Sequence, residues 1–429
     1  MLSDSTQTLK WIDGLRGIAS VSVLTTHLAR ALDYDLFFPR DPGENSSPRL
    51  LQWPIIRLLW QGRIGVTIFA LMTGYVCALK PLRLIRARNS QAAFSTIAKS
   101  AFRRVPRFVL PATIAMIIAW ALCQCGAFTV AHRIDVPWLR DASPTKSHSL
   151  SHAVHQLVWN FRSVWTTGQM DYDDHQWALL PLLKGSMMVY VTTSITVFCK
   201  YPYRLMIYAL LYCYFYQDCR ADTETFGAQF FFGMLLCDFA QDPAAQALLS
   251  AHPCPRTIAS FLLILTGLIF ASYPADHADW TRWSRAMDGV APYIFPQDVS
   301  RPKRYTALGV ECIAMGIQLS PTARTLLSFP WLLWLGKHSF GVYLLHGTLL
   351  KTLLVWMLWG PSGQPWVETK NEQGEVIPPA WLQRGGRLTL TMAIPIWVVI
   401  VYVAAYLWTT YVDSWCARMT QRLERVAFE

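Results

Sequence analysis

Residues 11–30 read WIDGLRGIASVSVLTTHLAR. From Leu15 to Leu32 the chain has the apolar content of a membrane helix, yet it carries Arg16 near its start and His27 near its end. At about 100° per residue these two side chains point to nearly the same side of a helix, about 16 Å apart along its axis. An ionisable residue inside a membrane segment normally faces the protein interior or a wet cavity, so the pair predicts a polar seam through a helical bundle. The alternative is that Arg16 snorkels to one interface while His27 caps the other end.

The composition places the chain among membrane proteins. Of its 429 residues 53% are hydrophobic and only 15% are charged, whereas a soluble domain has about 25% charged residues. The net charge of +11 does not indicate a nucleic-acid partner, because no basic domain is set apart and the charges lie mainly in loops. Two uses remain for the positive charge, namely orienting the chain in lipid and binding an anionic ligand.

The apolar segments predict an all-α, polytopic membrane bundle of about ten transmembrane helices, forming one domain over residues 1–429 and surrounded by membrane lipids. The expected spans are 15–32, 66–82, 108–128, 178–198, 203–216, 226–239, 257–273, 305–319, 331–359 and 388–411. Three long loops are expected at 129–177, 274–304 and 360–387.

A basic connector, residues 80–107, sets the expected orientation. It holds eight Lys and Arg residues and no acid, which by the positive-inside rule predicts a cytoplasmic position. With ten spans, both the N- and the C-terminus are then cytoplasmic. The endoplasmic reticulum or another endomembrane is the expected location.

Two groups of residues suit chemistry on a hydroxyl group and a phosphate. His27 in a low-dielectric site is a candidate general base, because the pKa of imidazole lies near the working pH. Arg103, Arg104 and Arg107 precede the third span, and arginine clusters bind phosphates bidentately. Basic residues at a cytoplasmic helix end are also expected without any ligand.

Residues 336–347, GKHSFGVYLLHG, carry a second polar face. Ser339, Tyr343 and His346 are spaced by four and three residues, so they share one side of a helix and indicate a cavity; structural hydrogen bonds between helices are the alternative. In the second span Gly65 and Gly74 flank Phe69, where helix packing is the alternative to a functional role. No Walker loop, no G-x-G-x-x-G run and no zinc-type spacing is present, so no bound cofactor or metal is expected.

Four of these stretches together resemble the acyltransferase 3 family of integral-membrane O-acyltransferases, in the style of its fungal members. The first is an Arg and a His separated by ten residues, Arg16 and His27, after Asp13-Gly14-Leu15. The others follow in the family's order: Ile64-Gly65-Val66 through Thr73-Gly74-Tyr75, then Arg104-Val105-Pro106-Arg107, then Leu335-Gly336-Lys337-His338-Ser339 through Tyr343-Leu344-Leu345-His346. The resemblance covers nearly the whole chain.

The resemblance implies an acyltransferase that moves an acyl group, usually acetyl from acetyl-CoA, to a hydroxyl of a small-molecule, sugar or lipid acceptor, as in fungal secondary-metabolite biosynthesis. It implies that His27 is the catalytic base or acyl relay and that Arg16 holds His27 or the donor. Arg103, Arg104 and Arg107 would contact the CoA phosphates. Tyr75, Ser339, Tyr343 and His346 would line the substrate cavity.

One position departs from the family pattern. Fungal members read Trp-Thr-Leu-Pro-Val-Glu-Phe-Lys-Gly-Ser before the fourth span, and here Leu182 stands at the Glu. Either Glu311 or the pair Asp173-Asp174 supplies the acid, or His27 suffices, or activity is weak; we expect an active enzyme with a shifted acid. The competing functions are a transporter-like or lipid-handling protein that uses the same polar cavity, and a non-catalytic family member.

Overall fold

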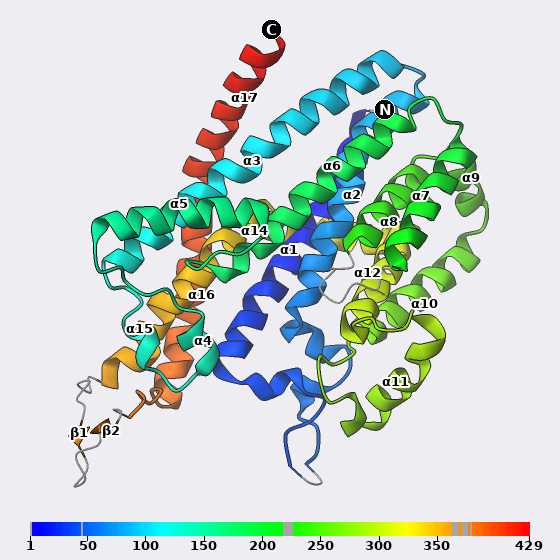
Figure 1. Cartoon of the computed structure of the whole chain (residues 1–429). Helices are drawn as coiled ribbons and strands as arrows, with labels where there is room; N and C mark the ends of the chain where they lie inside the picture. Colours follow the sequence, from blue (N-terminus) through cyan, green and yellow to red (C-terminus); the bar gives the residue numbers. More distant parts are fainter. Residues whose placement is uncertain (1, 44–45, 218–225, 363–368, 371–375, 378–379) are drawn as a thin grey trace. The chain divides into compact units, whose positions relative to one another are not determined.

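The computed structural model describes residues 2–43, 46–217, 226–362, 369–370, 376–377 and 380–429 (Figure 1). Helices make up most of it, as the apolar segments predicted. The two strands found among the described residues, β1 (Thr369–Lys370) and β2 (Val376–Ile377), pair antiparallel with Thr369 opposite Ile377. Part of the expected loop 360–387 lies outside the described residues.

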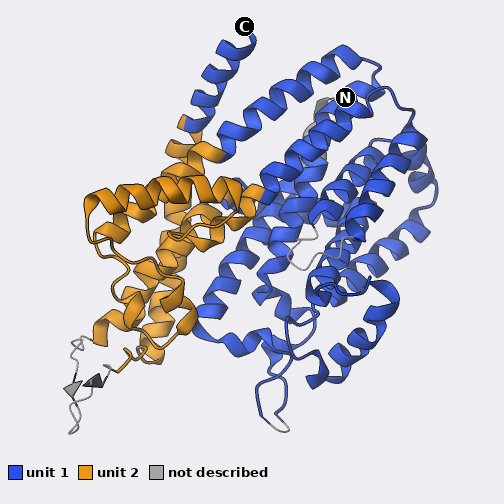
Figure 2. Ribbon diagram, viewed as in Figure 1, with its two compact units in different colours: residues 1–108, 181–339, 416–429 blue, residues 109–180, 340–415 orange. Residues whose placement is uncertain are grey.

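The helices divide between two compact units (Figure 2). The first unit comprises residues 1–108, 181–339 and 416–429, and the second comprises residues 109–180 and 340–415. The first contains α1 (Leu2–Leu32), α2 (Gly62–Arg86), α7 (Tyr201–Tyr216), α8 (Phe226–Ala240), α9 (Pro243–Ala251), α10 (Pro253–Ala271), α11 (Arg282–Ile294), α12 (Arg301–Leu319) and α13 (Pro321–Leu327). The second contains α4 (Pro137–Asp141), α5 (Leu150–Thr166), α15 (Val355–Trp359) and α16 (Arg387–Leu407). The chain passes from one unit to the other within α3 (Ser90–Gln124), α6 (Leu179–Ile195), α14 (Pro330–Leu349) and α17 (Ser414–Phe428).

Shorter helical turns complete the fold. Single-turn 3-10 segments lie at Tyr34–Phe37, Leu50–Gln52, Ile56–Trp60, Ala131–Arg133, Asp174–Ala178, Ala278–Trp280 and Gly360–Ser362. Two π-helical segments follow α14 and α16, at Leu350–Leu354 and Trp408–Asp413.

Six helical segments among the described residues are long and apolar enough to cross a membrane. They are Gly62–Arg86, Ser90–Gln124, Asp174–Ile195, Pro253–Ala271, Pro330–Ser362 and Arg387–Phe428. The other four expected spans fall on α1, α7, α8 and α12. Helices α7 and α8 have 16 and 15 residues, fewer than the roughly 20 that cross a bilayer. The count of ten spans therefore stays a prediction.

The basic connector is mostly helical. Helix α2 continues to Arg86 and α3 begins at Ser90, so only the turn at 87–89 separates them. The third expected span therefore begins well before residue 108, because its basic lead continues the same helix. The expected loop 129–177 likewise holds α4 and α5. Helix α5 begins at the N-cap Ser149, whose side chain accepts a hydrogen bond from the backbone N–H of His152, and this is a common helix start.

Glycines let the helices of the first unit touch backbone to backbone. Helix α2 packs on both α1 and α8. A Cβ atom on Gly74 of α2 would lie 2.1 Å from the carbonyl oxygen of Phe230, and one on Gly233 of α8 would lie 2.1 Å from that of Leu71. Small residues at such crossings are what allow apolar helices to pack closely. Close helix packing therefore explains Gly74, and this was the alternative to a functional role for the glycines of the second span.

A buried ion network ties α2, α7 and α8 together. The Asp238 side chain is fully buried and accepts hydrogen bonds from Arg86 Nη2 at 2.7 Å and from Arg204 Nη2 at 2.9 Å. Asp242 lies 3.1 Å from Arg86 Nη1. Removing one partner from a buried pair leaves an uncompensated charge, so this network fixes how the three helices meet.

Replacing Gly233 by Val tests the close crossing of α2 and α8. We expect a loss of about 1–3 kcal/mol in the free energy of unfolding, because the new side chain must displace the α2 backbone. Thermal unfolding of the detergent-purified protein measures it. Gly289→Ala is the matched control, since a Cβ there meets nothing within 4 Å, and its midpoint should be equal or higher. Equal midpoints for Gly233→Val and wild type would contradict the crossing.

Candidate active site

The glycines around Arg16 bring α1 against the end of α13 and the start of α14. A Cβ on Gly14 would lie 1.7 Å from the carbonyl oxygen of Leu327, and one on Gly336 would lie 1.9 Å from that of Asp13. Any larger side chain at either position separates the two segments. The run Asp-Gly-Leu-Arg-Gly is therefore a contact surface that presents Arg16 to residues 327–339.

Arg16 is held by two oxygen acceptors at this contact. Its Nη1 lies 3.4 Å from Asp13 Oδ1, one turn earlier on α1, and its Nη2 donates to Ser339 Oγ at 3.4 Å. The buried Ser339 hydroxyl in turn donates to the carbonyl of Gly336 at 2.8 Å. The structure thus brings two of the predicted site residues together, and the carboxylate beside Arg16 is Asp13.

His27 and Tyr75 occupy other parts of the first unit. His27 is half-buried on α1. Tyr75 of α2 is 1% exposed and its ring meets the ring of Trp11 edge to face, with centroids 5.8 Å apart. Within the described part of the chain the Tyr75 hydroxyl has no hydrogen-bond partner. A buried hydroxyl of this kind is normally satisfied, so it is a candidate contact for a bound molecule.

The three arginines of α3 differ in their surroundings. Arg103 lies 3.5 Å from Glu424 Oε2. Arg104 donates from Nε to Ser186 Oγ at 2.9 Å, and its guanidinium lies over the Phe108 ring at 4.5 Å. Arg107 is exposed. The side chain that is most open to an external phosphate is thus that of Arg107.

Leu182 lies one helical turn before the partner of Arg104. Its side chain is 9% exposed within the apolar core of the first unit. Its carbonyl accepts a hydrogen bond from Ser186 Oγ at 2.7 Å, and Ser186 is the residue that Arg104 contacts. A carboxylate at position 182 would therefore lie one helical turn from Ser186, the residue that Arg104 contacts.

Glu311 has neutral partners. Its buried carboxylate accepts hydrogen bonds from Tyr212 OH and Gln229 Nε2, both at 2.7 Å. Neither partner is a histidine or an arginine. Glu311 thus joins α7, α8 and α12 by hydrogen bonds.

In the second unit Asp173 and His175 form a buried pair. Asp173 Oδ1 accepts from His175 Nδ1 at 2.7 Å and from the His175 backbone N–H at 3.3 Å. Both side chains are at most 2% exposed. The Tyr343 hydroxyl donates to the carbonyl of His175. Tyr343 therefore holds the backbone of the pair, which is a more specific role than lining a cavity.

His346 lies beside His175, with ring centroids 4.9 Å apart. Its Nδ1 lies 3.0 Å from the carbonyl oxygen of Val342 and 2.9 Å from that of Tyr343. An Nδ1 that faces carbonyl oxygens carries the proton, so Nε2 of His346 bears the lone pair. The structure brings together two residues predicted from the late motif, Tyr343 and His346, with two acids named as possible substitutes, Asp173 and Asp174.

Two residues of this cluster were missed at the level of sequence, His175 and Lys351. The Lys351 side chain is fully buried; its ammonium group donates to Asp174 Oδ1 and, at 2.8 Å, to the carbonyl of Ala142. For Lys351 the signal was a lysine inside the apolar stretch 331–359, because a charged side chain at membrane depth is usually paired with an opposite charge or a carbonyl group. For His175 the signal was its spacing of two residues from Asp173.

Asp173, Asp174 and His175 also have ligand atoms within 4.8 Å of one another, close enough for a metal ion. The Lys351 ammonium already supplies a positive charge to Asp174. A divalent cation here would add a second charge beside it, so we interpret the group as a hydrogen-bonded cluster.

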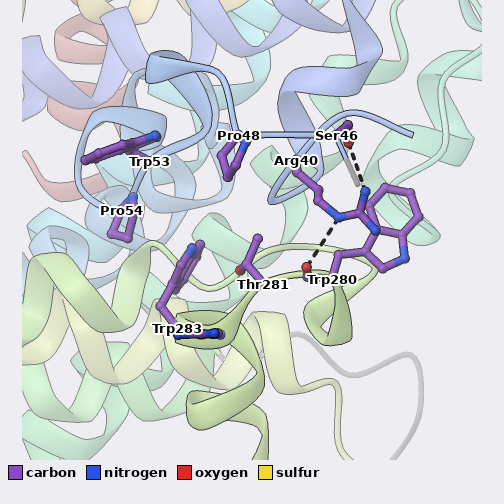
Figure 3. A pocket seen from close by; sticks show the side chains of 9 residues that line it. Arg40, Ser46, Pro48, Trp53, Pro54, Trp280, Thr281 and Trp283 are labelled. Carbon is purple, nitrogen blue, oxygen red and sulfur yellow. Dashed lines mark hydrogen bonds between the residues drawn. The ribbon is translucent and has the colours of Figure 1, made fainter. Parts of the chain in front are cut away.

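The first unit contains a cavity of about 640 Å³ walled by Trp53, Trp280 and Trp283 (Figure 3). Arg40 lies at one end of the cavity, beside Trp280, and donates to the carbonyl of Trp280 at 3.3 Å and to Ser46 Oγ at 2.9 Å. Figure 3 shows the Trp53 and Trp283 rings on opposing segments, the loop after α1 and the start of α11. Such walls suit a flat apolar ring system.

The backbone beside this cavity is strained. Ile55 has φ of 69°, and the N–H of Ile56 donates to the carbonyl of Pro54 at 2.8 Å, which closes a tight three-residue turn. A β-branched residue at positive φ is a genuine outlier, and such strain gathers at functional sites. Behind the wall the buried Arg57 lies over the Trp283 ring at 5.7 Å. Burial lowers the pKa of Arg57 to about 10, so the side chain stays charged at neutral pH.

The second unit has a polar cavity of about 610 Å³ in the segment 141–174. Its lining includes Asp141, Lys146, His152, Tyr172 and Asp174. Burial raises the pKa of Tyr172 to about 12, so its hydroxyl remains a hydrogen-bond donor at neutral pH.

Comparison with known proteins finds fungal acyltransferases. "Acyltransferase clz18" of Cochliobolus lunatus is 24% identical over 84% of this chain and 85% of its own length. "Acyltransferase R4" of a Phoma species is 25% identical over 82% of this chain and 86% of its own. "O-acetyltransferase PaAT-1" of Phomopsis amygdali is 25% identical over 80% of this chain and 72% of its own. No solved structure matches the chain significantly.

The family model described as an acyltransferase domain, Acyl_transf_3, matches residues 9–414. That range includes Arg16, His27, the α3 arginines and the cluster around His175. The chain belongs to the acyltransferase 3 family and is an acyltransferase.

Proposed function

We propose that the protein is a membrane-bound O-acyltransferase that moves an acetyl group from acetyl-CoA to a hydroxyl of a small-molecule acceptor in fungal-type secondary metabolism. The observation that carries the proposal is the setting of Arg16. It is fixed between Asp13 and Ser339 by backbone contacts at Gly14 and Gly336. A charged side chain placed between two polar partners at a contact of apolar helices is a candidate site feature.

The proposed roles follow the family resemblance. His27 is the base or acyl relay, and Arg16 orients it or the donor. Arg103, Arg104 and Arg107 bind the CoA phosphates, which suits the fork geometry of guanidinium. Arg107, the exposed member, makes the first contact. CoA is a co-substrate here, and the proposal includes no bound cofactor.

The proposed setting is a multi-pass membrane protein of ten spans, in the endoplasmic reticulum or another endomembrane, with both termini cytoplasmic. The arginine-rich ends of α2 and α3 then face the compartment that supplies acetyl-CoA. The tryptophan-walled cavity supports an acceptor with an apolar ring system over a simple sugar. A transporter-like or non-catalytic function is the competing proposal, and turnover decides between them.

The first test replaces His27 by Ala and measures CoA release from acetyl-CoA with a pool of hydroxylated acceptors. We expect at least about a 100-fold fall in rate, since general-base removal has effects of that order. His155→Ala is the control, because His155 is exposed on α5, and it should retain the wild-type rate. Equal rates for His27→Ala and wild type would remove His27 from the chemistry.

The second test concerns phosphate recognition. Arg104→Gln and Arg107→Gln should each raise the KM for acetyl-CoA about 10-fold, the effect of one lost charge-assisted contact. With acetyl-pantetheine, which lacks the nucleotide phosphates, both variants should match wild type. Arg418→Gln, an exposed site on α17, serves as the control. A KM that rises equally for both donors would show that these arginines do not bind the phosphates.

The third test restores the missing family acid. Leu182→Glu places a carboxylate one turn from Arg104, whereas Leu182→Gln buries a neutral amide at the same place. We expect Leu182→Glu to keep a higher unfolding midpoint than Leu182→Gln, because an unsatisfied buried polar group costs about 1–3 kcal/mol. Thermal unfolding compares the two. A lower midpoint for the glutamate variant would mean that Arg104 does not reach position 182.

A further inference from the structure

We infer that His175 is a general base for the acceptor hydroxyl, held in its working tautomer by Asp173. The inference rests on the proposed O-acyl transfer, but it gives the proton of the acceptor hydroxyl to His175 in place of His27, so the two histidines are competing assignments for the base. It is argued within the second unit alone.

The tautomer of His175 follows from its partner. A carboxylate is an acceptor, so the 2.7 Å contact from Asp173 Oδ1 requires the proton on His175 Nδ1. The lone pair of the neutral ring then lies on Nε2, at the opposite side of the imidazole. A carboxylate that orients histidine in this way also stabilises the imidazolium formed when Nε2 takes a proton.

Helix α14 and the turn after it are shaped to receive this pair. Tyr343, Gly347 and Lys351 succeed one another at four-residue intervals. The Tyr343 hydroxyl holds the His175 carbonyl and the Lys351 ammonium holds Asp174. Between them, a Cβ on Gly347 would lie 2.2 Å from His175 Nδ1 and 2.6 Å from Asp173 Oδ1. The glycine therefore leaves the space that the pair occupies.

The neighbouring charges are arranged so that Asp173 acts on His175. Asp174 Oδ1 lies 3.3 Å from His175 Nδ1, but Lys351 neutralises it. Asp173 receives no cation among the described residues, and its Oδ2 has no hydrogen-bond partner there. His346, beside His175, also presents an Nε2 lone pair, because its Nδ1 faces two carbonyls. Each ring therefore has an Nε2 that can accept a proton from a hydroxyl group.

The chemical step balances without a further reagent. His175 Nε2 takes the proton of the acceptor hydroxyl as that oxygen attacks the acyl carbonyl carbon of the thioester. The carbon–sulfur bond breaks, the thiolate of CoA leaves, and the imidazolium returns the proton to it. The products are the acyl ester and CoA. Asp173 forms and breaks no covalent bond and is a positioning residue.

The experiment compares the full-length protein with His175→Gln, Asp173→Asn and Asp173→Glu. We expect His175→Gln to lower kcat about 10²–10⁴-fold, with the dissociation constant of acetyl-CoA unchanged. Asp173→Asn should lower kcat similarly, and Asp173→Glu should recover part of it, which a merely structural role would not predict. His155→Gln, exposed in the same unit, is the matched control. Wild-type kcat in His175→Gln would overturn the proposal.

A second readout does not depend on turnover. With ¹⁵N-labelled histidine, the resonance that disappears in His175→Gln should show a protonated Nδ1, and this signal should change in Asp173→Asn. A protonated Nε2 with a bare Nδ1 would overturn the dyad even if no acceptor were found. If wild type shows this tautomer but transfers no acyl group to any acceptor, the proposed function fails and His175 is not a catalytic base, although the hydrogen-bonded dyad exists. Activity lost to a chelator and restored by zinc would replace the dyad with a metal site.

Discussion

The close approach of helix backbones at glycine is the constraint on which the first unit depends. Lipid tails are as apolar as leucine, so helices in a membrane are held mainly by packing and by polar contacts between them. At Gly14, Gly74, Gly233 and Gly336 a single added carbon would overlap a carbonyl oxygen of the facing segment. Arg16 is the polar residue inserted into this contact. Its position is therefore set by the backbone on both sides and needs no strong ion pair.

The positions of the helices were predictable because apolar runs longer than fifteen residues have few alternatives. The expected spans 178–198, 257–273 and 388–411 match α6, α10 and α16 within a few residues. Ends were less predictable, as with α3, because a basic amphipathic lead continues a helix without an apolar signal. Arg16 and Ser339 are 323 residues apart in sequence, so the spacing of residues within one helix could not predict that they pair.

The site of the second unit was half visible in the sequence. Tyr343 and His346 share a helix face and were found by periodicity, and Asp173 was named as a spare acid. Its partner His175 lies in a 3-10 turn, Asp174–Ala178, where no regular periodicity exists. Lys351 was visible as a charge in a mostly apolar stretch, but its acceptors Asp174 and the carbonyl of Ala142 lie far away in the sequence. The periodicity of a sequence predicts which residues share a helix face, but it does not predict which residues of a turn pack against that face.

The π-helical turn at Leu350–Leu354 has a consequence for chain length. A π turn holds one residue more than an α turn, and each residue advances a helix by about 100°. Lys351 sits within this turn, and the indoles of Trp356 and Trp359 downstream donate to the carbonyl of Ala127 at 2.7 Å and to Asp135 at 3.0 Å. The π turn accommodates this extra residue by underwinding, so the loss of one residue would restore a regular α-helix and leave both indoles facing nearly the same side, whereas a further inserted residue would turn them away from their acceptors by about 100°. This short stretch should therefore accept the removal of a residue more readily than the insertion of one.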